Sequence, residues 1–162
     1  MDEGGAANGG ERDHGHGTFR TWDGHPISPE PPHGAMIVVY RCSEGRPEFL
    51  LLHRRHNGAD YEGDWAWTPP SGARYPGEPV DGCARRELEE ETGLILQPTR
   101  VSTGSAEWPA YVVEVSADTP IQLCPEHDRY VWLPFDETSS RLAPAVVRDN
   151  FATAASTLPG CE

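Results

Sequence analysis

The chain has 162 residues with 13 Lys+Arg against 26 Asp+Glu, so its formal net charge is −13. This length suits one domain, and a hydrophobic content of 36% can supply one core. The acidic excess argues against duplex nucleic acid and anionic membrane surfaces as partners, because both bind cationic faces. All 13 basic residues are Arg, which excludes a Schiff-base lysine and a phosphate-binding loop of the Gly-rich Lys type.

The N-terminal part of the chain is poor in residues that can be buried. Residues 1–17 hold six Gly and several acids, which is typical of a disordered tail. Residues 18–33 are Pro-rich, and we expect them to pack on a domain that covers residues 34–160. No signal-peptide pattern and no apolar run of roughly 20 residues is present. We therefore expect a soluble, cytoplasmic protein.

Four cysteines are scattered along the chain, and no two of them have metal-ligand spacing. They are Cys42, Cys83, Cys124 and Cys161. We expect four reduced thiols, as is usual for a cytosolic protein.

Apolar patterning predicts strands and helices in alternation. Continuous apolar runs rich in β-branched residues predict strands at 35–40, 48–53, 110–115 and 130–133. Residues 81–92 predict a helix, with Asp81 as its N-cap and Gly93 at its C-terminal end. A last helix is expected from Pro144, with an apolar stripe formed by Val147, Phe151, Ala154 and Leu158. Together these elements indicate an α/β domain with helices covering a mixed sheet.

Three acids of the 81–92 helix share one face. Glu87, Glu90 and Glu91 stand at i, i+3 and i+4, so their carboxylates lie close together. Like charges at this spacing repel each other unless the face is fully solvated or cations neutralise it. Oxygen ligands of this kind suit Mg²⁺ or Mn²⁺ better than Zn²⁺. A solvated acidic face is the alternative.

The spacing around these acids favours the metal-binding interpretation. Gly72, five residues, Glu78, seven residues and then Arg86-Glu87-Leu88-Glu89-Glu90-Glu91-Thr92-Gly93-Leu94 match all nine specified positions of the Nudix box. Over about residues 34–158 the chain resembles Nudix hydrolases. The expected context of the box, a loop followed by a helix and a turn, also agrees with the predicted elements.

The resemblance implies a Nudix-type α/β/α sandwich with a mixed β-sheet. It also implies a divalent-metal-dependent pyrophosphohydrolase that cleaves a diphosphate linkage in a nucleoside diphosphate derivative. Such a substrate is a dinucleoside polyphosphate, a nucleotide sugar or a nucleoside triphosphate. The alternative is a catalytically silent Nudix-fold module that senses a nucleotide, although such modules commonly lose box glutamates and none is missing here.

The resemblance also assigns roles to box residues. Glu90 and Glu91 would hold Mg²⁺ or Mn²⁺, with Glu87 as a further ligand or general base. Arg86 would hold the acids in place, and its i,i+4 spacing to Glu90 independently predicts an ion pair. Glu78 would support the loop. The carbonyl of Gly72 would complete the metal shell.

Candidates outside the box are less sharply defined. Glu126 precedes the strand at 130–133, in a stretch similar to the diadenosine polyphosphate branch of the family, where it would be a metal ligand or catalytic base. An exposed loop acid is the alternative. Arg54 belongs to a basic cluster at 53–56 that would steer phosphates, unless it is only a solvated strand end.

Two residues downstream of the box suggest different substrate classes. Counted from Gly93, Pro109 at position 16 resembles ADP-ribose hydrolases, whereas Tyr111 at position 18 resembles diadenosine polyphosphate hydrolases. Tyr111, Trp65, Trp67 and Trp108 would stack on a base, or would be core or sheet-face aromatics. We expect a small nucleotide-type substrate and a monomer or homodimer.

Overall fold

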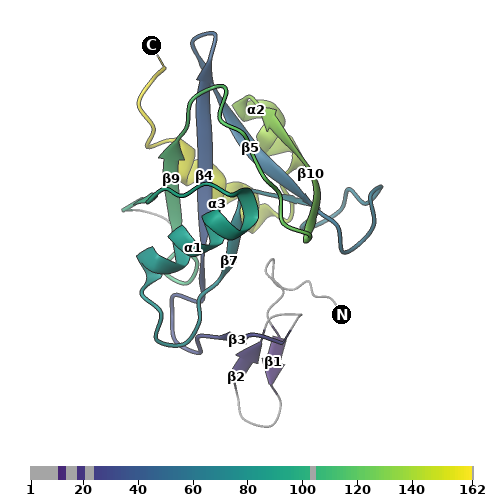
Figure 1. Cartoon of the computed structure of the whole chain (residues 1–162), viewed down its shortest axis with the longest axis vertical. Helices are drawn as coiled ribbons and strands as arrows, with labels where there is room; N and C mark the ends of the chain where they lie inside the picture. Colours follow the sequence, from purple (N-terminus) through teal and green to yellow (C-terminus); the bar gives the residue numbers. More distant parts are fainter. Residues whose placement is uncertain (1–10, 14–17, 21–23, 103–104, 162) are drawn as a thin grey trace.

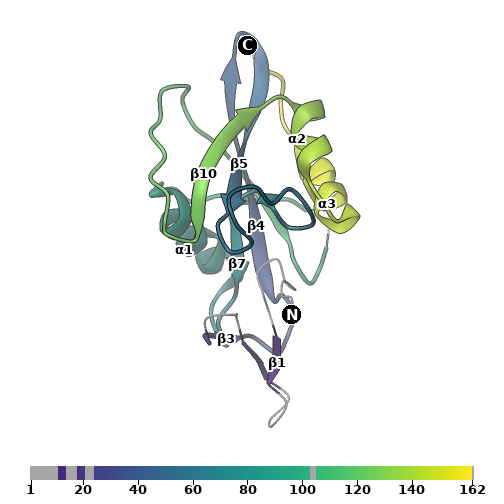
Figure 2. The ribbon, with the colours of Figure 1, turned by 90° about the vertical axis from the view of Figure 1, so that its right-hand side faces the viewer.

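The computed structural model describes residues 11–13, 18–20, 24–102 and 105–161. Its elements, in chain order, are β1 Glu11–Asp13, β2 Thr18–Arg20, β3 Pro26–Ile27, β4 Gly34–Ser43, β5 Arg46–Arg54, β6 Trp67–Thr68, β7 Ser71–Ala73, α1 Val80–Thr92, β8 Thr99–Arg100, β9 Ala110–Glu114, β10 His127–Leu133, α2 Phe135–Arg141 and α3 Ala145–Ala155. Figure 1 shows β4 and β5 running through the middle of the molecule, with α1 crossing one face. In Figure 2, α1 lies on one side of the sheet and α2 and α3 lie on the other.

The central sheet is mixed. Its strand order is β10-β5-β4-β9-β8, with β6 paired to β5 and β7 paired to β4. The pair β4–β9 is parallel, whereas the other pairs of this sheet are antiparallel. The predicted α/β/α sandwich with a mixed sheet is therefore confirmed.

The apolar run of β4 is continuous because helices cover both of its faces. Its even-numbered residues from Met36 to Tyr40 join a cluster with Phe151 of α3. The odd-numbered residues from Ala35 to Val39 join a second cluster with Leu88 of α1. Strand side chains alternate between faces, so a strand buried on both sides shows no polar alternation.

Helix α1 matches the predicted helix except at its first turn. Gly93 ends it in the left-handed conformation at φ 78°, and its N–H donates to the carbonyl of Glu89. The expected N-cap is wrong, because Pro79 occupies that position and no side chain caps the helix. Asp81 lies inside the first turn, where an acid favours the helix dipole.

The C-terminal part of the chain differs from the prediction in two respects. Helix α3 ends at Ala155, so Leu158 continues the apolar contact from beyond the helix. The short helix α2 was not predicted, because its sequence Phe-Asp-Glu-Thr-Ser-Ser-Arg is polar and only seven residues long.

The expectation of four reduced thiols is wrong. Cys42 and Cys161 form a disulfide with a Cα–Cα distance of 5.6 Å, across a sequence separation of 119 residues. Local spacing carries no information on a pair that only the tertiary fold brings together. Cys83 and Cys124 are the free cysteines of the described residues.

The segment before β4 makes polar contacts with the loop after β7. Arg74 Nε donates to the carbonyl of Pro32 at 2.6 Å, and Arg74 Nη2 donates to Ser28 Oγ at 2.9 Å. Of the tail predicted to be disordered, residues 1–10 and 14–17 lie outside the described residues, and Glu11–Asp13 forms β1. The domain boundaries stay a prediction. None of the helices in the described ranges has the length and hydropathy to cross a bilayer.

Candidate functional site

Two glutamates of α1 are buried against β7. Glu87 is 9% exposed and Glu91 is 6% exposed, and they stand one turn apart on the same face. A Cβ added at Gly72 would overlap the Glu87 carboxyl group, so the glycine leaves the space that this carboxyl occupies. The Ser71 N–H donates to Glu91 Oε1 at 3.1 Å and fixes the second carboxyl against the same strand. The sequence could not reveal this backbone donor, since any residue supplies one.

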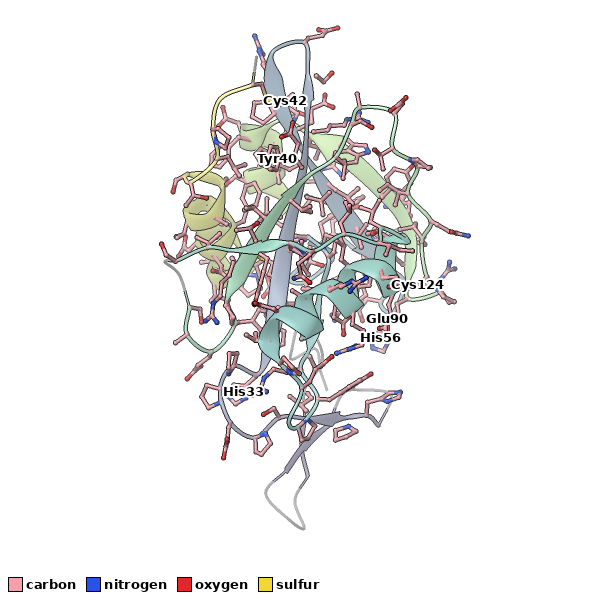
Figure 3. The ribbon with its side chains drawn as sticks, turned by 60° about the vertical axis from the view of Figure 1, so that its left-hand side comes forward. His33, Tyr40, Cys42, His56, Glu90 and Cys124 are labelled. Carbon is pink, nitrogen blue, oxygen red and sulfur yellow. A yellow bond between two sulfur atoms is a disulfide. The ribbon has the colours of Figure 1, made fainter. Side chains whose placement is uncertain are left out.

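The third acid of the predicted face lies at its rim. The Glu90 side chain is 54% exposed, and its Oε1 accepts a hydrogen bond from Arg86 Nη1 at 3.3 Å. The predicted i,i+4 pair is thus confirmed. Figure 3 shows Glu90 and Cys124 on the same side of the molecule, beside α1.

Arg86 connects these acids to the loop between β7 and α1. Its Nε and Nη2 donate to the two carboxylate oxygens of Glu78 at 2.8 and 3.0 Å, and its Nη1 donates to Glu87 Oε2 at 2.9 Å. Nη2 also donates to the carbonyl of Ala73 at 2.9 Å. The guanidinium lies 4.0 Å from the centre of the Tyr75 ring. The hydrogen bonds to Glu78 and Ala73 hold the planar Arg86 guanidinium in one orientation. The guanidinium in turn leaves the Glu87 carboxylate little freedom to move.

Glu78 holds the loop in turn. Its Oε1 accepts a hydrogen bond from the Tyr75 N–H at 3.1 Å. Partial burial opposes ionisation of Glu78, but the hydrogen bonds from Arg86 and from the Tyr75 N–H outweigh it and lower its pKa. Glu78 is therefore a charged structural acid, as the family resemblance implies.

The buried acids have the opposite electrostatics. Burial raises the pKa of Glu87, against the influence of Arg86 and with that of Glu90 and Glu126. Burial also raises the pKa of Glu91 well above its ordinary value, and the charges of Glu87 and Glu126 add to the effect. A cation bound between these buried carboxylates would offset their repulsion and stabilise their charged forms.

The structure brings Glu126 and Arg54 to these acids. Glu126 is exposed in the turn before β10, yet its charge acts on both Glu87 and Glu91. Arg54 ends β5, and burial lowers its pKa while the charges of Glu126 and Glu91 raise it. The predicted candidates from outside the box thus lie beside the box acids, and their roles stay predictions.

The two aromatic residues predicted to bind substrate are buried instead. Tyr111 is 0% exposed beneath α1, and its hydroxyl donates to Asp81 Oδ1 at 2.5 Å. Trp67 is 2% exposed, and its Nε1 donates to Glu62 Oε1 at 2.8 Å. Their burial favours a packing role, the alternative for both rings, and their stacking on a base stays a prediction. Trp65 is only half-buried.

The Gly72 carbonyl is held mainly by the strand and helix around it. Cys83 Sγ of α1 donates to this oxygen at 3.9 Å, and a Cβ added at Gly34 of β4 would overlap it. Its predicted part in a metal shell stays a prediction. The buried thiol of Cys83 is a contact that sequence reasoning did not single out.

The donor set at this site fits a hard divalent cation. Glu87, Glu90, Glu91 and Glu126 supply carboxylate oxygens, which Mg²⁺ and Mn²⁺ prefer. Burial and the neighbouring acids raise the pKa values of Glu87 and Glu91, and the charges of Arg86 and Arg54 oppose this only in part. A bound cation would supply the remaining charge compensation.

Known proteins are similar to this chain in sequence or in fold. Bis(5'-nucleosyl)-tetraphosphatase [asymmetrical] from Sus scrofa is 34% identical over 103 residues, which are 56% of this chain and 66% of the pig protein; the match thus spans just under two thirds of that relative. A C. elegans Ap4A hydrolase binary complex aligns with a TM-score of 0.61 at 23% identity, over 76% of this chain and 94% of that one.

The fold recurs at lower identity as well. The E. coli dihydroneopterin triphosphate pyrophosphohydrolase aligns with a TM-score of 0.61 at 17% identity, over 82% of this chain and 99% of that one. The family model described as NUDIX domain matches residues 31–153, which include the box, the buried acids of α1 and Glu126. The chain therefore belongs to the NUDIX domain family.

Proposed function

We propose that the protein is a divalent-metal-dependent pyrophosphohydrolase that cleaves a diphosphate linkage in a nucleoside diphosphate derivative. The observation that carries this proposal is the buried pair Glu87 and Glu91, which Arg86 and the Ser71 N–H hold in place beside Glu126. Burial of two repelling carboxylates costs stability, so a fold that keeps them gains another advantage from them. Metal binding for phosphate chemistry is that advantage.

The residues present suggest a division of labour. Glu90, Glu91 and Glu87, with the Gly72 carbonyl, would hold Mg²⁺ or Mn²⁺, which lowers the pKa of an attacking water and neutralises phosphate oxygens. Glu87 or Glu126 would accept the proton of that water.

Two arginines would act beside these acids. Arg86 keeps the Glu87 carboxylate in one orientation through the 2.9 Å bond, which limits the motion that would misplace a proton acceptor. Arg54 would contact a phosphate oxygen, because its cation lies beside Glu91 and Glu126, where the substrate's phosphates must approach.

Among substrates, we favour dinucleoside polyphosphates. The relatives named bis(5'-nucleosyl)-tetraphosphatase and Ap4A hydrolase support this class. With Tyr111 and Trp67 buried, Trp65 is the member of the predicted aromatic set that keeps exposed surface close to the end of β5. It would stack on a base. Pro109 remains the residue that favours ADP-ribose.

The test is a panel of substrates with purified enzyme and Mg²⁺. A dinucleoside tetraphosphate, ADP-ribose, a nucleotide sugar and a nucleoside triphosphate are compared by kcat/KM, with products separated by chromatography. We expect the dinucleoside tetraphosphate to be cleaved with the highest kcat/KM. A preference for ADP-ribose would overturn the substrate class, and binding without hydrolysis of any compound would favour the nucleotide-sensing alternative.

The assembly and the compartment are also proposals. A monomer or homodimer is expected, and light scattering in solution decides between them. For the compartment we keep the cytoplasm, and the Cys42–Cys161 bond is the observation against it, because disulfides persist mainly in oxidising compartments.

A further inference from the structure

A second set of potential metal ligands lies in the turn before β10. Cys124, Glu126 and His127 each offer one ligand atom, and these atoms lie within 4.8 Å of one another. The Cys124 Sγ and His127 Nδ1 are 3.8 Å apart. In the described part of the chain, no other group of three such donors is this compact.

We propose that this turn binds a thiophilic divalent ion of the Zn²⁺ class through Cys124, His127 and Glu126. Tetrahedral zinc with its usual bond lengths to sulfur and nitrogen places these two donors about 3.6 Å apart, close to the spacing found here. The Glu126 carboxylate lies in the same compact group and would complete the third position. Sulfur and imidazole ligands separate this site from the oxygen-only acids of α1.

The backbone of the turn is fixed by its neighbours. The Arg55 N–H donates to the carbonyl of Glu126 at 2.9 Å, and Arg55 Nε donates to the carbonyl of Pro125 at 2.9 Å. The N–H of His127 donates to the carbonyl of Cys124 at 3.2 Å, which closes the turn. His127 is 7% exposed, so its ring is held by the fold. A ligand set on a fixed backbone loses little entropy when it binds an ion.

Acidic groups act on both proposed ligands. The charges of Glu91 and Glu126 act on the Cys124 thiol, and that of Asp128 acts on His127, where Arg54 and His53 oppose it. Binding would release the thiol proton of Cys124 to solvent, so that the ion is held by a thiolate. The fourth position stays open to water, as it does in sites with three protein ligands.

Glu126 would serve both sites, so the two sites would compete for its carboxylate. An ion held by Cys124 and His127 would draw the Glu126 carboxylate away from the acids of α1. Low concentrations of Zn²⁺ would then inhibit hydrolysis in the presence of excess Mg²⁺. This consequence rests on the proposed function, whereas the binding site itself does not.

Binding is tested with Co²⁺ alone on the full, unreduced chain without Mg²⁺. Because Cys42 and Cys161 are bonded and Cys83 is 0% exposed, a thiolate-to-cobalt absorption band must come from Cys124. Histidines elsewhere, including His14 and His16, give no such band. We expect one equivalent of Co²⁺ to produce the band and one equivalent of Zn²⁺ to displace it.

Variants separate this site from adventitious binding. Cys124→Ser should abolish the band, and His127→Asn should weaken Co²⁺ binding at least about 10-fold, the lower end of the loss seen even for indirect metal contacts. His56→Asn, which changes an exposed histidine, is the matched control and should leave the band unchanged. Circular dichroism checks that each variant is folded. A band that survives in folded Cys124→Ser, or no band in the wild type, would overturn the site.

Activity provides an independent measurement. With Mg²⁺ in excess, Zn²⁺ should inhibit the wild type, and Cys124→Ser should keep its basal rate while losing at least about 10-fold of the Zn²⁺ sensitivity. Equal Zn²⁺ inhibition of both proteins would overturn the shared role of Glu126 even if the cobalt band is present. Absence of any hydrolysis would contradict the proposed function and leave the spectroscopic test of the site unaffected.

Discussion

Gly72→Ala tests whether the position of the Glu87 carboxylate matters for activity. The three atoms nearest the added Cβ are the carboxyl carbon and both oxygens of Glu87, and all three would overlap it. The side chain must rotate away and give up its 2.9 Å bond to Arg86. A hydrogen bond between charged groups contributes about 1.5–3 kcal/mol. For a domain of this size that loss lowers Tm by about 3–12 °C.

The effect on catalysis should be larger than the effect on stability. Displacing one positioned carboxylate should lower kcat about 10²-fold, the lower end of the cost of removing one electrostatic stabiliser. Initial rates with saturating Mg²⁺ and a dinucleoside tetraphosphate measure kcat, and calorimetry measures Tm. Gly82→Ala is the matched control within α1. A Cβ added at Gly82 would meet only Pro79, at 3.9 Å. It should keep kcat and raise Tm by a few degrees, because Ala favours a helix over Gly by about 1 kcal/mol.

The double variant Gly72→Ala/Glu87→Asp sharpens the test. An aspartate is one methylene shorter, so its carboxyl group lies farther from the new Cβ. We expect the double variant to recover part of the kcat that Gly72→Ala loses, although Glu87→Asp alone should be slower than the wild type. Unchanged kcat in a folded Gly72→Ala protein would refute the argument that this glycine makes room for a functional acid.

Three further predictions follow from the site and the fold. Burial and neighbouring acids hold the folded-state pKa of Glu91 above its ordinary value of 4.5, so the metal-free protein loses stability as pH rises above about 4.5 toward that raised pKa. Glu91→Gln should therefore raise the metal-free Tm at pH 7–8 and leave it unchanged at pH 4. The reverse pattern would contradict the raised pKa. Glu126→Gln should lower kcat, whereas Trp65→Leu should mainly raise KM, because stacking acts on ground and transition states alike; an unchanged kcat in Glu126→Gln would make Glu126 an ordinary loop acid. Thiol titration of the denatured, unreduced chain should find two free thiols, and four would contradict the Cys42–Cys161 bond.

The sequence predicted the elements whose patterns are local. Strand β4 and the helix that ends at Gly93 could be predicted without tertiary information. Their signals, a continuous apolar run and a C-terminal glycine, lie within the segments themselves. The spacing of the box likewise placed Glu87 and Glu91 on one face. Their burial could not be predicted, because it depends on β7 lying against α1 and on the absence of a side chain at Gly72.

What the sequence could not show depends mainly on contacts between distant segments. Tyr111 and Trp67 are aromatic residues near the expected site, but only the fold decides which side of a strand a helix covers. Cys42 meets Cys161 across the whole domain. Cys124 and His127 are near neighbours in the sequence, but only the turn before β10 brings the thiol and the imidazole within 3.8 Å of each other.

The central claim is that the buried acids of α1 hold a divalent metal that hydrolysis requires. It is tested most directly by the Mg²⁺ dependence of the hydrolysis rate, measured on a dinucleoside tetraphosphate for the wild type and for Glu91→Gln. The account predicts no turnover with chelator, saturation of the wild-type rate with Mg²⁺, and a kcat at least about 10²-fold lower in a folded Glu91→Gln protein. Full activity in excess chelator, or an undiminished Glu91→Gln enzyme, would contradict it.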